Sequence, residues 1–129
     1  MIAGVILAGG RARRMGGAVK AGVTLGGISL FAHVRRRLEP QCALLLVSGG
    51  DPGLPVSDLP VIVDEHPGLG PVCAVAGVLG WLARRRPECR WLAVSAVDTP
   101  FLPEDFVSRL HHTAVAAEAR LAVARSGAR

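Results

Sequence analysis

The amino-acid sequence predicts an α/β protein with a mainly parallel sheet. Short apolar runs alternate with stretches of helical periodicity, which is the pattern of βαβ units. Three of the apolar runs lead into glycine or aspartate residues. The chain has 129 residues, 50% of them hydrophobic, which suffices for a substantial core. We therefore expect a single domain over residues 1–129.

The first half of the chain contains three predicted strands and one predicted helix. An apolar strand over residues 2–7 leads into a glycine-rich loop. Ser29 can then cap a helix that Pro40 stops. Four apolar residues at helical spacing form its inward face: Leu30, Phe31, Val34 and Leu38. The next strands cover residues 43–47 and 60–63.

The second half continues with helix, strand and helix. A helix over residues 72–85 has four apolar residues on its predicted inward face: Val72, Val75, Leu79 and Leu82. A strand follows over residues 91–97, and a short helix over residues 104–111 directs Phe106 and Leu110 inward. Residues 114–123 stay open, because their alanines favour helix while Leu-Ala-Val at 121–123 suits a strand.

Charge and composition narrow the class of partner. A formal charge of +5 and a pI near 10.4 suit an anionic partner such as a nucleotide or a phosphorylated cofactor. Only 4% of residues are aromatic and none is tyrosine, which argues against stacking on single-stranded nucleic acid. The arginine clusters at 35–37 and 84–86 lie on predicted helices and are interpreted as solvated helix faces. We therefore expect no nucleic-acid partner.

Cysteine usage and hydropathy indicate a cytoplasmic location. The three cysteines are odd in number and form no C-x-x-C pair, so they support neither a disulfide framework nor a zinc site. The N-terminus lacks the basic region of a signal peptide. No run of about eighteen apolar residues is present to span a membrane. We therefore expect a cytoplasmic protein without a membrane partner.

The loop after the first strand has the composition of a polyphosphate-binding loop. Its glycines let backbone amides approach an anion without Cβ obstruction. Four cations fall within ten residues: Arg11, Arg13, Arg14 and Lys20. Guanidinium groups match phosphate oxygens well. The loop is neither a P-loop nor a dinucleotide fingerprint. The alternative is a solvated surface loop with incidental arginines.

Two further strands are followed by aspartates, Asp64 and Asp98. In open parallel sheets the carboxyl ends of the strands meet at one edge, where ligands bind. Both carboxylates can therefore face a triphosphate on the first loop, where one or two carboxylates and phosphate oxygens make a Mg²⁺ site. Capping or turn formation by the aspartates is the alternative. The central prediction is that Lys20 and Asp98 converge on one magnesium-bound nucleotide.

Several segments resemble the molybdenum cofactor guanylyltransferases. Residues Leu7 to Lys20 match the signature L-A-G-G-x-x-x-R-M-G-G-x-x-K, and Asp98-Thr-Pro-Phe-Leu-Pro looks like the D-T-P-F-L-P metal motif of that family. Asp64 with Gly70-Pro71 looks like its second nucleotide-contacting loop. Related cytidylyltransferases usually carry L-A-A-G, so the glycine pair at 9–10 favours the guanylyl branch.

This resemblance implies a fold, a reaction and partners. The fold would be a Rossmann-like three-layer α/β/α architecture of the nucleotide-diphospho-sugar transferase type. The reaction would move GMP from GTP to molybdopterin, or molybdenum cofactor, with release of pyrophosphate and with Mg²⁺ as cofactor. Molybdenum cofactor biosynthesis proteins or target apoenzymes are further partners that it implies.

The resemblance also assigns roles by matching position. Arg14, Lys20 and Asp98 would be the catalytic residues, with Asp98 as the metal ligand. The nucleotide- and cofactor-binding set would be Leu7, Ala8, Gly9, Gly10, Lys20, Ser48, Asp64, Gly70 and Asp98.

The chain also departs from the family pattern. Val19 replaces an aspartate before the loop lysine, Ser48 stands where an asparagine is common, and Ala74 replaces a glycine. The family continues past Arg129 with a His-Pro-Thr block, so we expect this chain to lack the C-terminal part of the family fold. Two alternatives follow: a related enzyme that transfers CMP or activates a sugar phosphate, and an inactive nucleotide-binding remnant.

Overall fold

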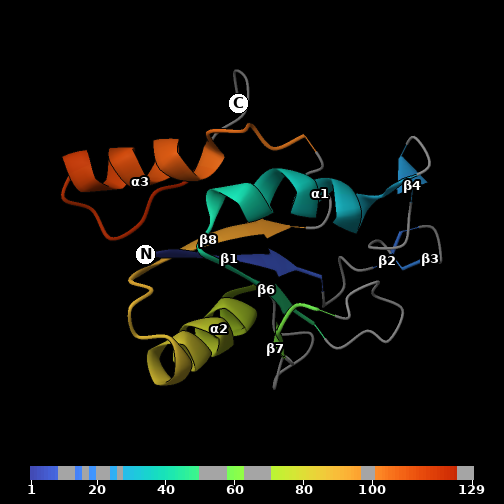
Figure 1. Ribbon diagram of the computed structural model, residues 1–129, viewed down its shortest axis with the longest axis horizontal. Coiled ribbons are helices and arrows are strands. Elements are labelled where there is room, and N and C mark those ends of the chain that lie inside the picture. Colours follow the sequence, from blue (N-terminus) through green and yellow to red (C-terminus); the bar gives the residue numbers. More distant parts are fainter. Residues whose placement is uncertain are drawn as a thin grey trace.

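A four-stranded parallel sheet forms the centre of the computed structural model (Figure 1). The structure describes residues 1–8, 14–15, 18–19, 24–25, 28–49, 58–62, 71–96 and 101–124. The strands are β1 (Ile2–Leu7), β6 (Leu44–Ser48), β7 (Val61–Ile62) and β8 (Trp91–Ala96). Their order is β7-β6-β1-β8, and every pairing is parallel. The predicted parallel sheet is therefore confirmed.

The register brings the carboxyl ends of all four strands to one edge. Leu7 at the end of β1 is paired with Ser48 of β6 on one side and with Ala96 of β8 on the other. Ser48 is in turn paired with Ile62 of β7. The four strands therefore end in a single row, as expected for a sheet whose ligand site lies beyond the strand ends.

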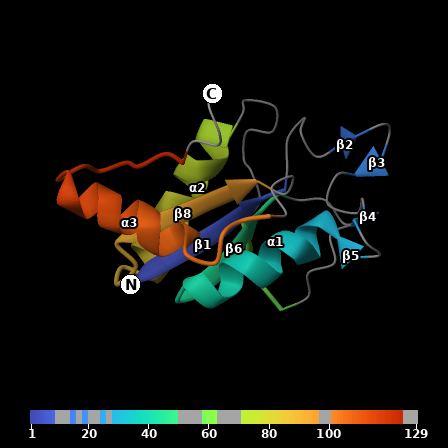
Figure 2. The ribbon, with the colours of Figure 1, turned by 90° about the horizontal axis from the view of Figure 1, so that it is seen from above.

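Helices cover both faces of this sheet. α1 (Leu30–Leu38) and α3 (Phe106–Ala116) lie on one face, and α2 (Pro71–Arg85) lies on the other (Figures 1 and 2). A short 3₁₀ helix, η3 (Glu39–Gln41), follows α1. The three-layer α/β/α architecture is thus confirmed.

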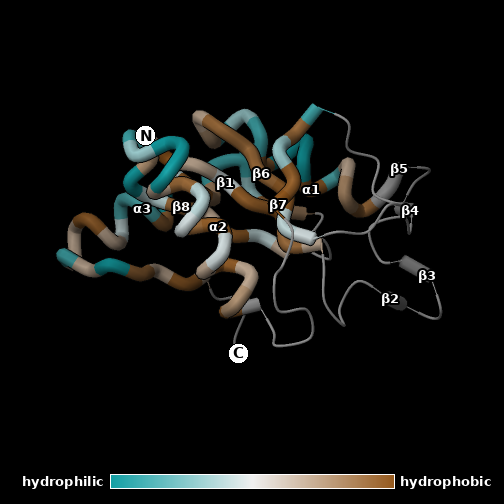
Figure 3. The backbone as a smooth tube through the Cα atoms, turned by 90° about the horizontal axis from the view of Figure 1, so that it is seen from below, coloured by the Kyte–Doolittle hydropathy of each residue, from teal (hydrophilic) through white to brown (hydrophobic). Residues whose placement is uncertain are grey.

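Side chains along the buried strands point alternately to the two faces of the sheet and contribute to two separate hydrophobic cores. Ile6 belongs to the core under α1 and α3, whereas Val5 belongs to the core under α2. Both are completely buried. The predicted inward face of α1 is confirmed, since all four of its apolar residues are buried. Hydrophobic residues accordingly concentrate along the sheet strands in Figure 3.

The inward face of α2 differs from the prediction. Val78 and Leu82 are buried, but Val72 and Leu79 are 78% and 51% exposed. The apolar residues of α2 extend almost around the helix, so two overlapping stripes compete and periodicity alone could not choose between them. The stripe that includes Val78 is the one that packs on the sheet.

Two short antiparallel hairpins were not predicted. β2 (Arg14–Met15) pairs with β3 (Ala18–Val19), and β4 (Thr24–Leu25) pairs with β5 (Ile28–Ser29). Both lie between β1 and α1 in the chain. A Gly-Gly pair separates the strands of each hairpin in the sequence, which is a known hairpin signal.

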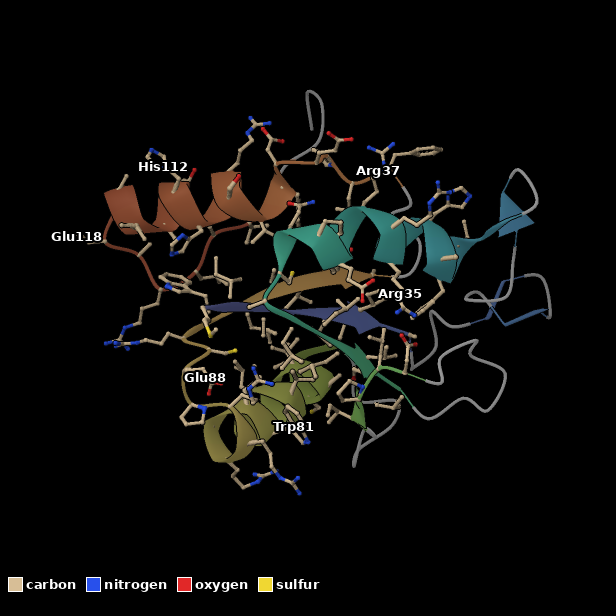
Figure 4. The ribbon with its side chains drawn as sticks, viewed as in Figure 1. Arg35, Arg37, Trp81, Glu88, His112 and Glu118 are labelled. Atoms are coloured by element: carbon tan, nitrogen blue, oxygen red, sulfur yellow. The ribbon has the colours of Figure 1, made fainter. Side chains whose placement is uncertain are left out.

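The last described segment resolves the ambiguity at residues 114–123. The helix α3 continues to Ala116, beyond the predicted end at residue 111, because Val107 and Ala114 are buried on its inward side. The chain then turns at Glu118, whose φ is 52° (labelled in Figure 4). Residues 121–124 form neither helix nor strand.

A close approach in the middle of β1 requires glycine. A Cβ added at Gly4 would lie 2.5 Å from the Sγ of Cys42, well inside van der Waals contact. Burial raises the pKa of the Cys42 thiol to about 11, so this neighbour is a neutral S–H group. The backbone of β1 and Cys42, two residues before β6, therefore fit together only without a side chain at position 4.

Replacing Gly4 should destabilise the fold. We expect Gly4→Ala to lower the free energy of unfolding by about 1–3 kcal/mol through overpacking, as measured by urea denaturation. The Gly4→Ala/Cys42→Ala double variant should recover part of that loss. Gly77 in α2 provides the control. A Cβ added there would meet nothing within 4 Å, so Gly77→Ala should raise the free energy of unfolding by about 1 kcal/mol. Equal stability of Gly4→Ala and the wild type would contradict this packing.

The C-terminus of α3 should tolerate glycine better than its natural residue. The Ala119 N–H donates to the Ala114 carbonyl and the Glu118 N–H to the Val115 carbonyl, the bonds of a Schellman motif. Glu118 therefore occupies the left-handed position that glycine prefers. Glu118→Gly should raise the free energy of unfolding by roughly 1 kcal/mol. Thermal melts of both variants measure this. Ala117→Gly is the control, because Ala117 has a φ of −91° and glycine there should give no gain in stability.

Candidate functional site

The topology defines a switch point at the carboxyl edge of the sheet. The connection from β1 through α1 leads to β6 on one side of β1, whereas the connection through α2 leads to β8 on its other side. The two helices cover opposite faces (Figure 2). The point between β1 and β8 is therefore the switch point of the sheet. Ligands of open α/β sheets bind at such points, outside the strand ends.

Two of the predicted nucleotide-contacting residues, Leu7 and Ala8, lie at this switch point. Leu7 ends β1 and is paired with Ala96, the last residue of β8. The Ala8 N–H donates to the Ser48 carbonyl at 2.8 Å, so pairing continues one residue beyond the strand. Ala8 is only 1% exposed. The chain thus leaves the sheet from a fixed, buried position immediately before residue 9.

Ser48 lies beside them at the end of β6. It is 2% exposed and sits between Leu7 and Ile62 in the register. Gly49 follows with φ 142°, a conformation that side-chain-bearing residues rarely adopt, and its N–H donates to the Ile62 carbonyl. The structure therefore brings Leu7, Ala8 and Ser48 into one neighbourhood at the carboxyl edge.

The other predicted site residues are placed in part or not at all. The backbone of Arg14 begins β2, where it is paired with Val19 across the hairpin. The remaining residues lie outside the described part of the chain: Gly9, Gly10, Lys20, Asp64, Gly70 and Asp98. For four of them the nearest described neighbour in the sequence lies at the sheet edge. Ala8 precedes Gly9 and Gly10, Ile62 precedes Asp64, and Ala96 precedes Asp98.

Helix orientation makes the carboxyl edge favourable for anions. Two of the three helices, α1 and α2, begin at the end of the sheet where the strands end, whereas α3 begins beside the end of α1 (Figure 1). Helix N-termini carry partial positive charge and unpaired N–H groups. No acidic residue occupies the first turn of α1 or α2. The edge can therefore attract phosphate groups.

The arginine clusters lie at the opposite ends of two helices. Arg35, Arg36 and Arg37 are in the last turn of α1, and Arg84 and Arg85 are in the last turn of α2. Cations there complement the helix dipole. Except for half-buried Arg35, these residues are exposed, as predicted for solvated helix faces.

Sequence reasoning missed the role of Arg35. Its Nη2 lies 2.6 Å from Oδ2 of Asp58, and its Nε lies 3.2 Å from Oε1 of Glu39 (Arg35 is labelled in Figure 4). The hydrogen bond from Arg35 lowers the pKa of Asp58. The pair joins α1 to the segment that enters β7. The Glu39 partner was visible as an i,i+4 spacing, but Asp58 was not.

A separate cavity lies away from this edge. It has a volume of about 390 Å³ and is enclosed by β8, α3 and residues 120–124, with Ile2 and Trp91 at the amino end of the sheet among its lining residues. The rings of Trp91 and His111 meet edge to face there, 5.1 Å apart. The cavity therefore does not coincide with the switch point.

The described part of the chain adds two structural findings. None of its helices combines the length and the apolar character needed to cross a bilayer. Among the same residues, no group of three or more His, Cys, Asp or Glu side chains is arranged to hold a metal ion.

The fold defines a doubly wound α/β/α protein whose switch point lies between β1 and β8. Residues 4–129 match the MobA-like NTP transferase domain, and the chain belongs to that family. The resemblance seen in the sequence is therefore confirmed, and the fold is of the nucleotide-diphospho-sugar transferase type.

Individual relatives agree with this assignment. The chain is 46% identical to the molybdenum cofactor guanylyltransferase of Rhodopseudomonas palustris (strain HaA2), over 97% of this chain and 60% of that protein. It is 45% identical to the protein of that name from Nitrobacter hamburgensis, over 96% of this chain and 61% of the relative. The chain thus spans about 60% of the length of these relatives.

A solved structure shares the fold. The crystal structure of Rv0371c from Mycobacterium tuberculosis H37Rv aligns with a TM-score of 0.60 at 19% identity. The alignment covers 89% of this chain and 61% of that one. At this level of identity the likeness shows a common fold.

Proposed function

We infer that the chain is the nucleotide-binding part of a guanylyltransferase that moves GMP from GTP to molybdopterin or molybdenum cofactor and releases pyrophosphate. The observation that carries this proposal is the pairing of Leu7 with Ala96 at the switch point. The cation-rich loop after Leu7 and the segment containing Asp98 therefore start from adjacent strand ends. The names of the relatives support the choice of nucleotide and acceptor.

Magnesium fits this arrangement. Proteins usually hold Mg²⁺ through one or two carboxylates together with substrate phosphates, and do not require a cluster of protein ligands. Asp98, two residues after the end of β8, would supply the carboxylate. Asp64 would contact the nucleotide or the metal from the β7 side. Asp98 would hold a Mg²⁺ ion whose positive charge would stabilise the negative charge that develops on the phosphates.

The residues of the chain would act chiefly by positioning and by charge neutralisation. An oxygen of the acceptor phosphate forms a bond to the α-phosphorus of GTP, the bond to the bridging oxygen breaks, and pyrophosphate leaves with the electron pair. Backbone groups from Leu7 to Gly10 would hold the nucleotide, and Ser48 and Gly70 would contact it from neighbouring loops. Arg14 and Lys20 would neutralise the phosphates. No nucleophilic side chain is required.

A nucleotide-binding module without transferase activity is the second candidate, and one observation favours it. Val19 is directly paired with Arg14 across the β2–β3 hairpin. Directly opposed residues of a hairpin have neighbouring Cβ atoms, so the aspartate that the family usually carries at position 19 would stand beside Arg14. This chain has a valine at position 19, which offers no carboxylate to orient the Arg14 guanidinium.

Nucleotide binding should be selective for guanine and should depend on magnesium. GTP with Mg²⁺ at about 100 times its dissociation constant stabilises a protein by about 2.7 kcal/mol, and we expect a smaller shift in Tm with CTP or ATP. Asp98→Ala should reduce the shift, whereas Gly77→Ala on the exposed side of α2 should retain it. Equal shifts for the three nucleotides would remove the guanylyl assignment.

Transfer itself separates the two candidates. With [α-³²P]GTP, Mg²⁺ and molybdopterin, the wild-type chain should form labelled molybdopterin guanine dinucleotide. Asp98→Ala should lower the rate of transfer at least roughly ten-fold, because the Mg²⁺ that accompanies GTP would lose its protein ligand. Thin-layer chromatography of the products measures this. If the wild type binds GTP but transfers no label, the binding module is the better description.

A further inference from the structure

The strand β8 lies at one edge of the described sheet but has the composition of an inner strand. Its six residues, Trp-Leu-Ala-Val-Ser-Ala, include no charged residue and no proline. Edge strands are usually protected by such residues or by being very short, as β7 is at the opposite edge with two residues. Continuous apolar runs are typical of strands inside a parallel sheet. The sequence of β8 therefore suits a strand that has a neighbour on its free side as well.

The free side of β8 carries backbone groups that no described residue pairs. The Ala8 N–H donates to β6, and because backbone groups alternate in direction along a strand, Val5 faces β8. Val5 is paired with Val94 and, in a parallel ladder, bonds to the two residues that flank Val94. The N–H and C=O groups of Leu92 and Val94 therefore point away from β1. Within the described part of the chain they form no backbone hydrogen bond on that side.

The cavity of about 390 Å³ lies along this free side. Leu92 and Val94 line it together with α3 and residues 120–124. Residues 117–124 return from the end of α3 and run beside β8 in the same direction (Figures 1 and 2). Residues 121–124 belong to no helix or strand, and Leu121 and Val123 are 77% and 76% exposed. The cavity is thus bordered by β8 and by a second segment that runs the same way.

We propose that this cavity is a docking slot for one further β-strand, which lies between β8 and residues 120–124. The backbone of the added strand would bond to the free N–H and C=O groups of Leu92 and Val94, as in other cases of strand addition to a sheet edge. Its side chains on the α3 side would meet Phe106 and Leu110 and should be apolar. The slot does not depend on the nucleotide or the reaction, so this inference goes beyond the proposed function.

The occupant of the slot is the polypeptide that the longer relatives carry beyond the part that this chain matches. The chain spans about 60% of the length of these relatives, so the remainder can readily supply a strand of about 5–6 residues. A second copy of the chain fits less well. Its own β8 belongs to a sheet, and residues 120–124 border the cavity where that sheet would have to pass. A single strand brings no further sheet with it.

Amide hydrogen exchange of the full chain, measured by NMR, tests the free side of β8. The Leu92 and Val94 N–H groups should exchange at least roughly ten-fold faster than those of Ala93 and Ser95, which face β1. Sedimentation should show a monomer. Slow exchange of Leu92 and Val94 in the monomer would mean that the free side is already paired, and would overturn the proposal. A dimer that protects both residues would assign the slot to a second copy and overturn the proposed occupant.

A chimera tests the occupant. It joins the end of this chain to the part of the Rhodopseudomonas palustris (strain HaA2) relative that lies beyond the match. Added polypeptide can slow exchange everywhere by stabilising the fold, so the measured quantity is the ratio of the Leu92 rate to the Ala93 rate. This ratio should fall roughly ten-fold in the chimera, and an unchanged ratio would overturn the proposal. If the chimera does not fold, the same ratio at the aligned positions of the intact relative decides in the same way.

Two adjacent proline substitutions serve as matched variants for the other side of the slot. Because N–H groups alternate in direction along a strand, only one of Ala122 and Val123 can donate into the slot, and proline removes that donor. Neither residue donates a backbone hydrogen bond within the described part of the chain, so Ala122→Pro and Val123→Pro should leave the Tm of this chain unchanged. In the chimera, or in the intact relative at the aligned positions, one of the two should lower Tm by several degrees more than the other. Equal Tm values would contradict a strand between β8 and residues 120–124.

Discussion

The parallel pairing of β1 on both of its sides is the constraint on which the rest of the structure depends. Its residues pair with β6 and with β8 along the same stretch, so neither edge of β1 is available to solvent. Parallel neighbours need crossover connections, and these place helices on the sheet faces. With one crossover on each face, the chain must reverse its winding beside β1. The switch point at the carboxyl edge follows from this reversal.

The same arrangement separates two kinds of positive charge. The arginines of α1 and α2 lie in the last turns, at the amino edge of the sheet, and contribute to the overall charge of +5 without facing the carboxyl edge. Charge at the carboxyl edge comes from the N-termini of α1 and α2 and, in the proposed site, from the loop that contains Arg14 and Lys20. The basic pI predicts an anionic partner, but the arginines in the last turns of α1 and α2 also complement the helix dipoles.

Elements with one strong periodic pattern were predictable, and contacts between distant residues were not. The strand β1 and the helix α1 have a single apolar run or face, and both were predicted closely. The face of α2 was not, because its surface is apolar almost all round. Gln41 and Pro103 are 62 residues apart, and no local pattern predicts their hydrogen bond. For the site, the sequence correctly placed Leu7, Ala8 and Ser48 at the sheet edge, while the roles of all the site residues stay predictions.

Ala74 changes how the start of α2 can contribute to the proposed site. It is the fourth residue of a helix that begins at Pro71, where a proline costs no hydrogen bond. Alanine stabilises a helix by about 1 kcal/mol relative to the glycine that the family carries there, but its Cβ limits close approach of a ligand to the backbone. The charge of the helix N-terminus is unaffected by this exchange. In this chain α2 would therefore attract the nucleotide electrostatically, and close backbone contact with the phosphates would be left to the loop that follows β1.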